Sequence, residues 1–284
     1  GGCHYTEGCD RYQESCGQCP QLASQREKDL SHQVWKRKQK AWKNVNLTIV
    51  TPSRWMADCV QASSLFRERR VEVIPFCLDT QLYRPIERPI ARQLLNLPPD
   101  KTLILFGAIA ATADRRKGFH LLIEALQRLS QSEQLTNTEL VVFGADEPDN
   151  PLDLGFKTHY LGSFADDISL ALVYSAADVM IVPSLAESFG QTASEALACG
   201  TPVVAFNATG LKDIIDHQEN GYLATPYEVE DLAQGIAWVL AGEERYQKLS
   251  VNAREKVENC FNLELQANAY HALFKDILAT SHQP

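Results

Sequence analysis

Short runs of apolar, largely β-branched residues recur along the chain between residues 47 and 206. The runs do not alternate strictly between apolar and polar positions, which is typical of strands that are buried on both faces of a parallel sheet. The predicted strands are residues 47–51, 71–75, 103–107, 140–144, 158–162, 179–183 and 202–206. The predicted helices between them are residues 119–129, 168–175 and 192–199. This alternation of strand and helix predicts a doubly wound α/β fold.

The pattern changes in two places. Prolines at positions 85 and 89 interrupt regular structure, and a domain boundary is therefore expected within residues 79–90. After about residue 228 the chain reads as three successive helices, with a break at Phe261-Asn262. The expected division is a partial N-terminal domain over residues 1–85, a second domain over 86–260 and a last helix over 261–284.

The composition and net charge of the chain limit the kinds of molecule that it is expected to bind. The 284 residues are 45% hydrophobic and 22% charged, as in ordinary globular proteins. The formal net charge of −9 argues against a nucleic-acid-binding surface, which needs concentrated positive charge. No apolar run reaches the roughly 18 residues that span a bilayer, and Gly1-Gly2-Cys3-His4 does not resemble a signal peptide. A cytoplasmic protein is expected.

Residues 25–43 form a basic stretch within this acidic chain. Its cationic side chains are Arg26, Lys28, Lys36, Arg37, Lys38, Lys40 and Lys43. One interpretation is a solvated helix face. The other is a surface that docks on anionic lipid headgroups, which would place the protein peripherally at the inner face of a membrane.

Four of the eight cysteines lie within the first 19 residues, and they are Cys3, Cys9, Cys16 and Cys19. The closing Cys-Gly-Gln-Cys has the spacing of a structural zinc knuckle. A closed site of four thiolates leaves no open position for substrate, so the predicted zinc is structural. Disulfides, free thiols or an iron–sulfur cluster are the alternatives.

The segment from residue 183 to residue 202 carries the strongest chemical signal. A buried strand is predicted to end at Pro183, and a helix is predicted to begin soon after Ser188. Unpaired amides at a helix start suit a phosphate, and Gly190 allows a ligand to approach the backbone closely. Glu187 and Glu195 are eight positions apart, so one carboxylate could bind sugar hydroxyls and the other ribose hydroxyls of a diphosphate ligand.

This segment resembles the Glu-x7-Glu motif of the family 4 retaining glycosyltransferases, which have two facing Rossmann-like domains (the GT-B fold). Further resemblance lies in residues 50–55, 73–75, 78–85 and 160–164. The resemblance implies a GT-B enzyme whose N-terminal domain is incomplete here, with roughly a hundred residues missing by domain size. It also implies that the last helix packs back on the first domain.

The resemblance assigns roles to individual residues. Lys117 of Arg115-Arg116-Lys117-Gly118 would neutralise the donor diphosphate, and Glu187 would be the catalytic residue that holds the donor sugar. The family's arginine often follows the glycine that ends the preceding strand, but Ala108 stands there, so Arg115 or Arg116 is expected to replace it. The remaining predicted donor-binding residues are Ser163, Phe164, Ser188, Phe189, Gly190, Gln191, Thr192 and Glu195.

The implied reaction is transfer of a sugar from a UDP- or GDP-sugar to a saccharide or lipid-linked acceptor, with retention of configuration and without a catalytic cofactor. Such hexosyltransferases act in cell-surface polysaccharide or glycan synthesis. The alternatives are a non-catalytic nucleotide-sugar-binding module, and a sugar-nucleotide epimerase or phosphorylase with the same fold.

Overall fold

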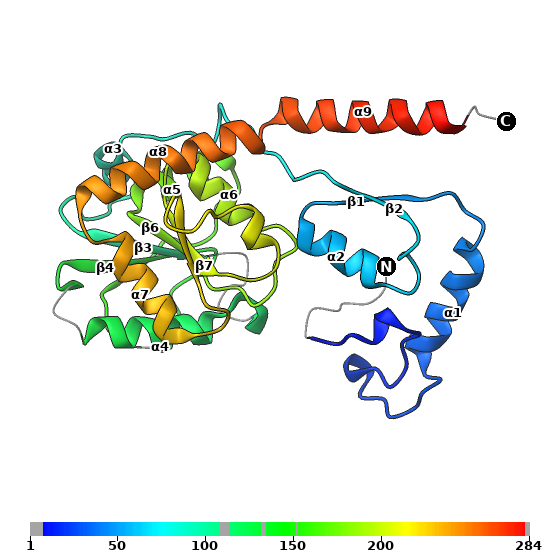
Figure 1. Cartoon of the computed structure of the whole chain (residues 1–284). Coiled ribbons are helices and arrows are strands. Elements are labelled where there is room, and N and C mark those ends of the chain that lie inside the picture. The colour runs from blue at the N-terminus through cyan, green and yellow to red at the C-terminus, as the bar shows by residue number, and fades with distance from the viewer. Residues whose placement is uncertain (1–7, 108–113, 132–134, 152, 282–284) are drawn as a thin grey trace. The chain divides into compact units, whose positions relative to one another are not determined.

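A computed structural model describes residues 8–107, 114–131, 135–151 and 153–281 (Figure 1). The chain forms two compact units, Gly1–Ile74 and Pro75–Pro284. The domain division expected at residues 85 and 86 stays a prediction, as does the packing of the last helix on the first domain. Among the described residues, no helix combines the length and apolar composition needed to cross a bilayer.

The first unit contains one β-α-β motif after an irregular start. Strand β1 pairs in parallel with β2, and Thr48 lies opposite Arg70. The elements of this unit are η1 (Arg11–Gln13), η2 (Pro20–Leu22), α1 (Leu30–Trp42), β1 (Thr48–Thr51), α2 (Arg54–Ala62) and β2 (Arg70–Val73).

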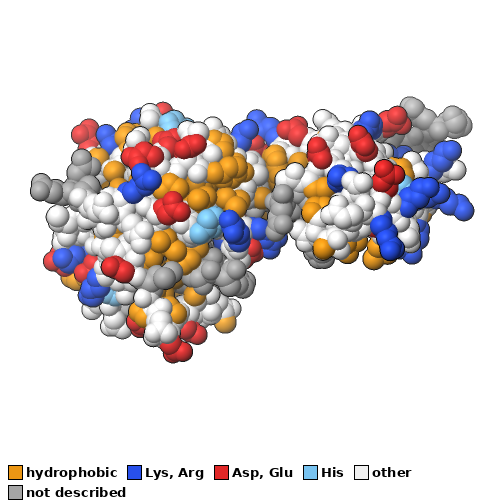
Figure 2. All heavy atoms as spheres, turned by 90° about the horizontal axis from the view of Figure 1, so that it is seen from below, with side chains coloured by type: hydrophobic (Ala, Val, Ile, Leu, Met, Phe, Trp, Pro, Cys, Tyr) orange, Lys and Arg blue, Asp and Glu red, His pale blue; other side chains and the backbone are white. Residues whose placement is uncertain are grey.

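Helix α1 carries the basic stretch. It is capped by Asp29, whose side chain accepts a hydrogen bond from the backbone N–H of His32 at 3.1 Å. The Trp35 indole N–H donates to the Ser64 hydroxyl at 3.0 Å, which fixes the apolar side of the helix. All the basic side chains of residues 25–43 except that of Lys38 are exposed; those on α1 or directly after it are Lys36, Arg37, Lys40 and Lys43. Figure 2 shows Lys and Arg side chains gathered at the right of the view, where α1 lies.

The second unit is built on a six-stranded parallel sheet. The strands are β3 (Thr102–Gly107), β4 (Thr138–Phe143), β5 (Thr158–Tyr160), β6 (Val179–Val182), β7 (Val203–Phe206) and β8 (Gly221–Ala224). Their spatial order is β5-β4-β3-β6-β7-β8. The chain thus moves outward from β3 in one direction and then returns to continue from β6 in the other, which is the strand order of a Rossmann-like domain.

Helices cover both faces of this sheet (Figure 1). One core cluster joins the sheet to α3, α5, α6 and α8, and the other joins it to α4, α7 and the start of α8. The helical elements are α3 (Arg88–Leu94), η3 (Arg115–Lys117), α4 (Phe119–Ser130), α5 (Asp167–Ala176), α6 (Gln191–Ala198), η5 (Thr209–Asp213), α7 (Val229–Val239), α8 (Glu243–Cys260) and α9 (Leu263–Ser281).

The fold class predicted from the sequence is confirmed as α/β with parallel sheets. The seven predicted strands and the three helices between them are all present, with ends within two residues of the prediction. The three helices expected after residue 228 are α7, α8 and α9. Strand β8 was not predicted, because it has only four residues and begins with a glycine.

The segment that precedes α3 belongs structurally to the second unit. The backbone N–H of Leu78 donates to the carbonyl of Phe261 at 3.0 Å. The guanidinium of Arg254 in α8 donates to the carbonyls of Thr80 and Tyr83, and also to that of Ala198 at the end of α6. One arginine therefore ties this segment to two helices.

Candidate functional site

The sheet has a topological switch point between β3 and β6. The loops that follow these two adjacent strands run to opposite sides of the sheet, because the strand order reverses there. In open α/β sheets this crevice at the carboxyl ends of the strands is where ligands bind. Lys117 follows β3 and Glu187 follows β6, so the fold brings two of the predicted site residues to the same crevice.

The loop after β3 approaches the end of β6 backbone to backbone. Gly118 ends the short helix η3 with a φ of +71°, and a Cβ atom there would lie 1.8 Å from the carbonyl oxygen of Pro183. The backbone N–H of Leu185 also donates to the carbonyl of Arg116 at 2.8 Å. Only glycine fits this position. The position of the neighbouring Lys117 relative to the end of β6 is therefore set by main-chain contacts.

Lys117 and Glu187 form an ion pair in which Nζ and Oε1 are 2.6 Å apart. The two side chains are 29% and 17% exposed, so the pair is partly shielded from solvent. Oε1 also accepts a hydrogen bond from the Ser184 hydroxyl at 3.0 Å. The Glu187 N–H donates to the hydroxyl of Thr209 at 3.0 Å. Both the carboxylate and the backbone of Glu187 are thus fixed.

The two arginines of the basic motif differ in their surroundings. The Arg116 guanidinium binds Asp114, with Nη2 and Oδ2 2.6 Å apart. The hydrogen bond from the Arg116 side chain is the main cause that lowers the pKa of Asp114. Arg115 is exposed, and within the described part of the chain no ion pair involves it. Which of the two binds a diphosphate stays a prediction.

The start of α6 offers unpaired amides to the same crevice. Gly190 precedes the helix with a φ of +113°, and the N–H groups of Ala193 and Ser194 donate to its carbonyl. The amides of Gln191 and Thr192 donate to no acceptor among the described residues. Ser188 is exposed, whereas the Phe189 side chain is 1% exposed and packs edge-on against Phe261. Phe189 can therefore meet a ligand only through its backbone.

Glu195 lies one turn further along α6, in a very different environment from Glu187. Its Oε2 accepts a hydrogen bond from the hydroxyl of Tyr174 in α5 at 2.7 Å. Burial raises the pKa of Glu195 to about 7, against the opposing effect of the Tyr174 hydrogen bond and with a further contribution from Asp167. Near neutral pH this carboxyl group is therefore divided between its protonated and ionised forms.

Ser163 and Phe164 follow β5, two strands away from β3. Ser163 is exposed, and Phe164 is half-buried against the core cluster that contains α5 and α6. The carbonyl of Gly162 accepts a hydrogen bond from the N–H of Gly144 at 2.8 Å, which joins the ends of β4 and β5. The donor-binding role of Ser163 and Phe164 stays a prediction.

Three side chains of this site were missed from the sequence. They are Ser184 and Thr209, which hold Glu187, and Tyr174, which holds Glu195. Ser184 could have been found as the first residue after the strand-ending Pro183. Thr209 and Tyr174 could not, since their contacts cross 22 and 21 positions of the chain.

The predicted metal ligands are described in part. Cys3 lies outside the described residues, and the side chains of Cys9, Cys16 and Cys19 are half-buried. Burial raises the pKa of Cys16, and the neighbouring Cys9 and Cys19 thiols raise it further, so these three groups act on one another. In the described part of the chain, no group of three or more His, Cys, Asp or Glu side chains is arranged to hold a metal. The four-thiolate site stays a prediction.

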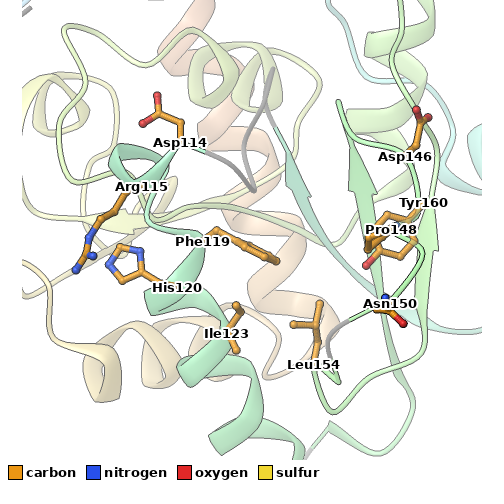
Figure 3. A pocket seen from close by; sticks show the side chains of 10 residues that line it. All are labelled: Asp114, Arg115, Phe119, His120, Ile123, Asp146, Pro148, Asn150, Leu154 and Tyr160. Carbon is orange, nitrogen blue, oxygen red and sulfur yellow. The ribbon is translucent and has the colours of Figure 1, made fainter.

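A cavity of about 580 Å³ lies beside the N-terminal half of α4 (Figure 3). It is lined by Asp114, Arg115, Phe119, His120, Ile123, Asp146, Pro148, Asn150, Leu154 and Tyr160. Arg115 is the one predicted site residue in this lining. The described residues between β4 and β5 form no helix, so this part of the α4 side is covered by a loop. Glu187 and Glu195 do not border the cavity.

Comparison with known proteins adds independent information. The model of the family described as glycosyl transferases group 1 matches residues 87–256. A D-inositol 3-phosphate glycosyltransferase from Saccharomonospora viridis is 32% identical over 220 residues, which cover 71% of this chain and 49% of that protein. The chain thus spans about half the length of the curated relatives it matches, with 44% covered in a second one, from Rhodococcus opacus.

Solved structures agree on the fold. A sucrose-phosphate synthase from Thermosynechococcus elongatus superposes with a TM-score of 0.75 at 28% identity, covering 97% of this chain and 67% of that one. The Anabaena protein HepE, crystallised with UDP and glucose, gives a TM-score of 0.64 at 23% identity, covering 84% of this chain and 66% of that one. Together these neighbours support a Rossmann-like domain of the GT-B type.

Proposed function

Because the chain belongs to the glycosyl transferases group 1 family, we propose that it binds the nucleotide-sugar donor of a hexosyltransferase. The reaction is transfer of the sugar from a UDP- or GDP-sugar to a hydroxyl of a saccharide or lipid-linked acceptor, with retention of configuration. Cell-surface polysaccharide or glycan synthesis is the process that such a transfer would serve.

The observation that carries this proposal is the arrangement at the switch point. The Lys117 ammonium group and the free amides of Gln191 and Thr192 border one crevice, with one carboxylate on either side of the start of α6. Cationic and N–H groups suit a diphosphate, and carboxylates suit hydroxyl groups. In this proposal the donor sugar lies at Glu187, the diphosphate at Lys117 and the ribose at Glu195.

The proposed catalytic effect is stabilisation of the negative charge on the leaving diphosphate. When the glycosidic bond of the donor breaks, negative charge builds on the leaving diphosphate. Lys117, an arginine of the pair Arg115 and Arg116, and the α6 amides would stabilise this charge. In the structure the Lys117 ammonium pairs with the Glu187 carboxylate. Donor binding would therefore exchange one partner of Lys117 for another, and would release Glu187 to accept hydrogen bonds from the sugar.

Calorimetric titration of the chain with UDP, GDP, UDP-glucose and GDP-mannose tests the proposal. We expect one nucleoside diphosphate to bind, and its sugar conjugates to bind at the same site in competition with it. Absence of binding by all four compounds would contradict the proposed function. In HepE the recorded ligands are UDP and glucose, which makes UDP the first compound to try.

Two subsidiary proposals concern the first unit. The exposed Lys36, Arg37 and Lys40 of α1, and Lys43 directly after it, suit contact with anionic lipid. Sedimentation with phosphatidylglycerol vesicles, but not with phosphatidylcholine vesicles, is expected, and K36E/K40E should abolish it.

For Cys3, Cys9, Cys16 and Cys19 we propose one structural zinc ion. Elemental analysis of protein purified under reducing conditions should give one zinc per chain, and a value near zero removes the metal.

A further inference from the structure

Tyr174 is one of the largest side chains that are fully buried in this protein, with 0% of its surface exposed. Its ring packs edge-on against Phe143 of β4, at a centroid distance of 5.6 Å and an interplanar angle of 86°. Its hydroxyl group donates to Glu195 Oε2 at 2.7 Å. A buried tyrosine hydroxyl needs a hydrogen-bond partner, and this ring is too tightly packed to turn toward another one.

Glu195 is therefore held at one oxygen by a fixed donor. Its other oxygen, Oε1, accepts no hydrogen bond from any residue that the structure describes. Neighbours on both sides along α6, Ser194 and Ala196, are buried. The carboxyl group thus has one oxygen bonded to a core side chain and one oxygen without a donor among the described residues, on a side chain that is partly exposed.

The groups around Glu195 come from several elements. Tyr174 and Asp167 face it from α5, and Tyr83 faces it from the segment before α3. The Tyr83 hydroxyl donates to Asp167 at 2.9 Å. Cys199 directly follows the helix of Glu195, and Arg254 of α8 acts on Cys199. Asp167 disfavours the ionised form of Glu195, and the one hydrogen bond that favours this form comes from Tyr174.

We propose that Tyr174 is a positioning residue, which orients Glu195 and stabilises its carboxylate so that Oε1 can accept the vicinal hydroxyls of the donor ribose. This inference rests on the proposed function and adds a residue to it. Two hydroxyl donors need an ionised acceptor, since a protonated carboxyl group would itself present a donor to one of them. Nucleotide affinity should consequently depend on the ionisation of Glu195.

The test is the dissociation constant of UDP-glucose, and of GDP-mannose, between pH 6 and pH 9, because the diphosphate of a nucleotide sugar loses no proton in this range, whereas the terminal phosphate of UDP or GDP does. In the wild type, affinity should rise with pH through about 7, where Glu195 ionises, and then level off. Tyr174→Phe should move this midpoint upward, because the carboxylate loses its stabilising donor. A rise of one pKa unit weakens binding by about tenfold at a pH below both midpoints. Most of this loss should be recovered at pH 9.

The matched control is Tyr222→Phe. The Tyr222 hydroxyl donates to Asp231 at the same distance of 2.7 Å, but its ring packs against the core on the opposite face of the sheet. This variant should leave the dissociation constant and its pH midpoint unchanged. Glu195→Gln, which cannot ionise, should flatten the pH profile and provides the test of ionisation if Tyr174→Phe does not fold. The loss of the ribose contact is checked with 2′-deoxy-UDP, which should bind more weakly to the wild type.

The outcomes separate the two proposals. If the wild type binds neither UDP nor GDP, the proposed function fails and the role of Tyr174 fails with it. If the wild type binds with the expected preference for ribose but Tyr174→Phe has an unchanged pH midpoint, the role of Tyr174 is overturned while the donor site stands. A flat profile in the wild type also overturns it. A uniform loss of affinity at every pH would indicate a purely structural role for the hydroxyl.

Discussion

Glu187 and Glu195 are the same residue type, eight positions apart, and the fold gives them opposite environments. Glu187 lies in an irregular loop, where the Lys117 ammonium neutralises its charge at 2.6 Å. Glu195 lies inside a helix, where burial raises its pKa to about 7 and a tyrosine hydroxyl is its hydrogen-bond donor. The negative charge of Glu187 is balanced by the Lys117 ammonium, whereas the charge of Glu195 is partly removed because the carboxyl group keeps its proton up to about pH 7.

This difference teaches how the two ends can respond to a ligand. The Glu187 carboxylate would exchange its Lys117 partner if the proposed diphosphate bound there. The carboxyl group near Tyr174 must lose its remaining proton to accept two hydroxyl groups. Binding at Glu187 should therefore depend on the charge of the ligand, and binding at Glu195 should depend on pH.

The largest expected effect is on stability, at the Glu195 end. An unfolded glutamate ionises near 4.5, whereas Glu195 in the folded chain keeps its proton up to about pH 7. Between these values the folded state binds more protons, so wild-type stability falls as pH rises from 4.5 to 7 and stays lower above it. Glu195→Gln lacks this loss and should be more stable than the wild type at pH 8, by about 3 kcal/mol.

Urea unfolding at pH 5 and pH 8 measures the difference, which should be small at the lower pH. Glu139→Gln is the matched control. Burial raises the pKa of Glu139, but the hydrogen bond from His159 and the charge of Lys157 lower it overall. That substitution should therefore destabilise the chain at pH 8. An equal stability gain for Glu195→Gln at both pH values would contradict burial as the origin of its effect.

The second effect is on nucleotide binding, at the Glu187 end. Lys117→Ala removes the cation that faces the crevice and should weaken UDP or GDP binding by about 1.5–3 kcal/mol, the usual contribution of a charge-assisted hydrogen bond. Arg128→Ala serves as control, since Arg128 pairs with Glu230 on the exposed side of α4. Such surface pairs contribute about 0–1 kcal/mol to stability. Equal affinities for the two variants would remove Lys117 from the site.

The smallest effect has the opposite sign. Glu187→Gln keeps the shape of the side chain but releases Lys117 from its ion pair. UDP or GDP alone should then bind at least as tightly as to the wild type, with a gain of up to about 1 kcal/mol. The corresponding nucleotide sugar should bind less tightly than to the wild type, because its sugar loses the carboxylate. Calorimetry with both ligands decides the matter, and weaker binding of the free nucleotide would show that Glu187 does not compete for Lys117.

Much of the fold could be predicted from the sequence, because the buried strands are continuous Val, Ile and Leu runs such as residues 179–182. Lys117, Glu187 and Glu195 could also be singled out from the sequence, since Lys117 precedes a predicted helix, Glu187 follows a predicted strand and Glu195 lies on the next predicted helix. What could not be predicted is which side chains hold these residues. The ring of Phe189 points into the core rather than the crevice, and the Tyr174 hydroxyl meets Glu195 across two helices. Both facts depend on how helices pack, which a linear pattern does not contain.

The contact between Gly118 and Pro183 has a consequence for protein engineering. A Cβ atom on Gly118 would meet the backbone carbonyl of Pro183 at 1.8 Å, and no rotamer change relieves a collision with main chain. A saturation library at this position should yield glycine alone among folded clones. The neighbouring Arg115 and Arg116 are exposed, and substitutions there leave the main chain unstrained. Substitutions at residues 115 and 116 can therefore be tested for their effect on binding without a steric clash of this kind, whereas residue 118 must stay glycine.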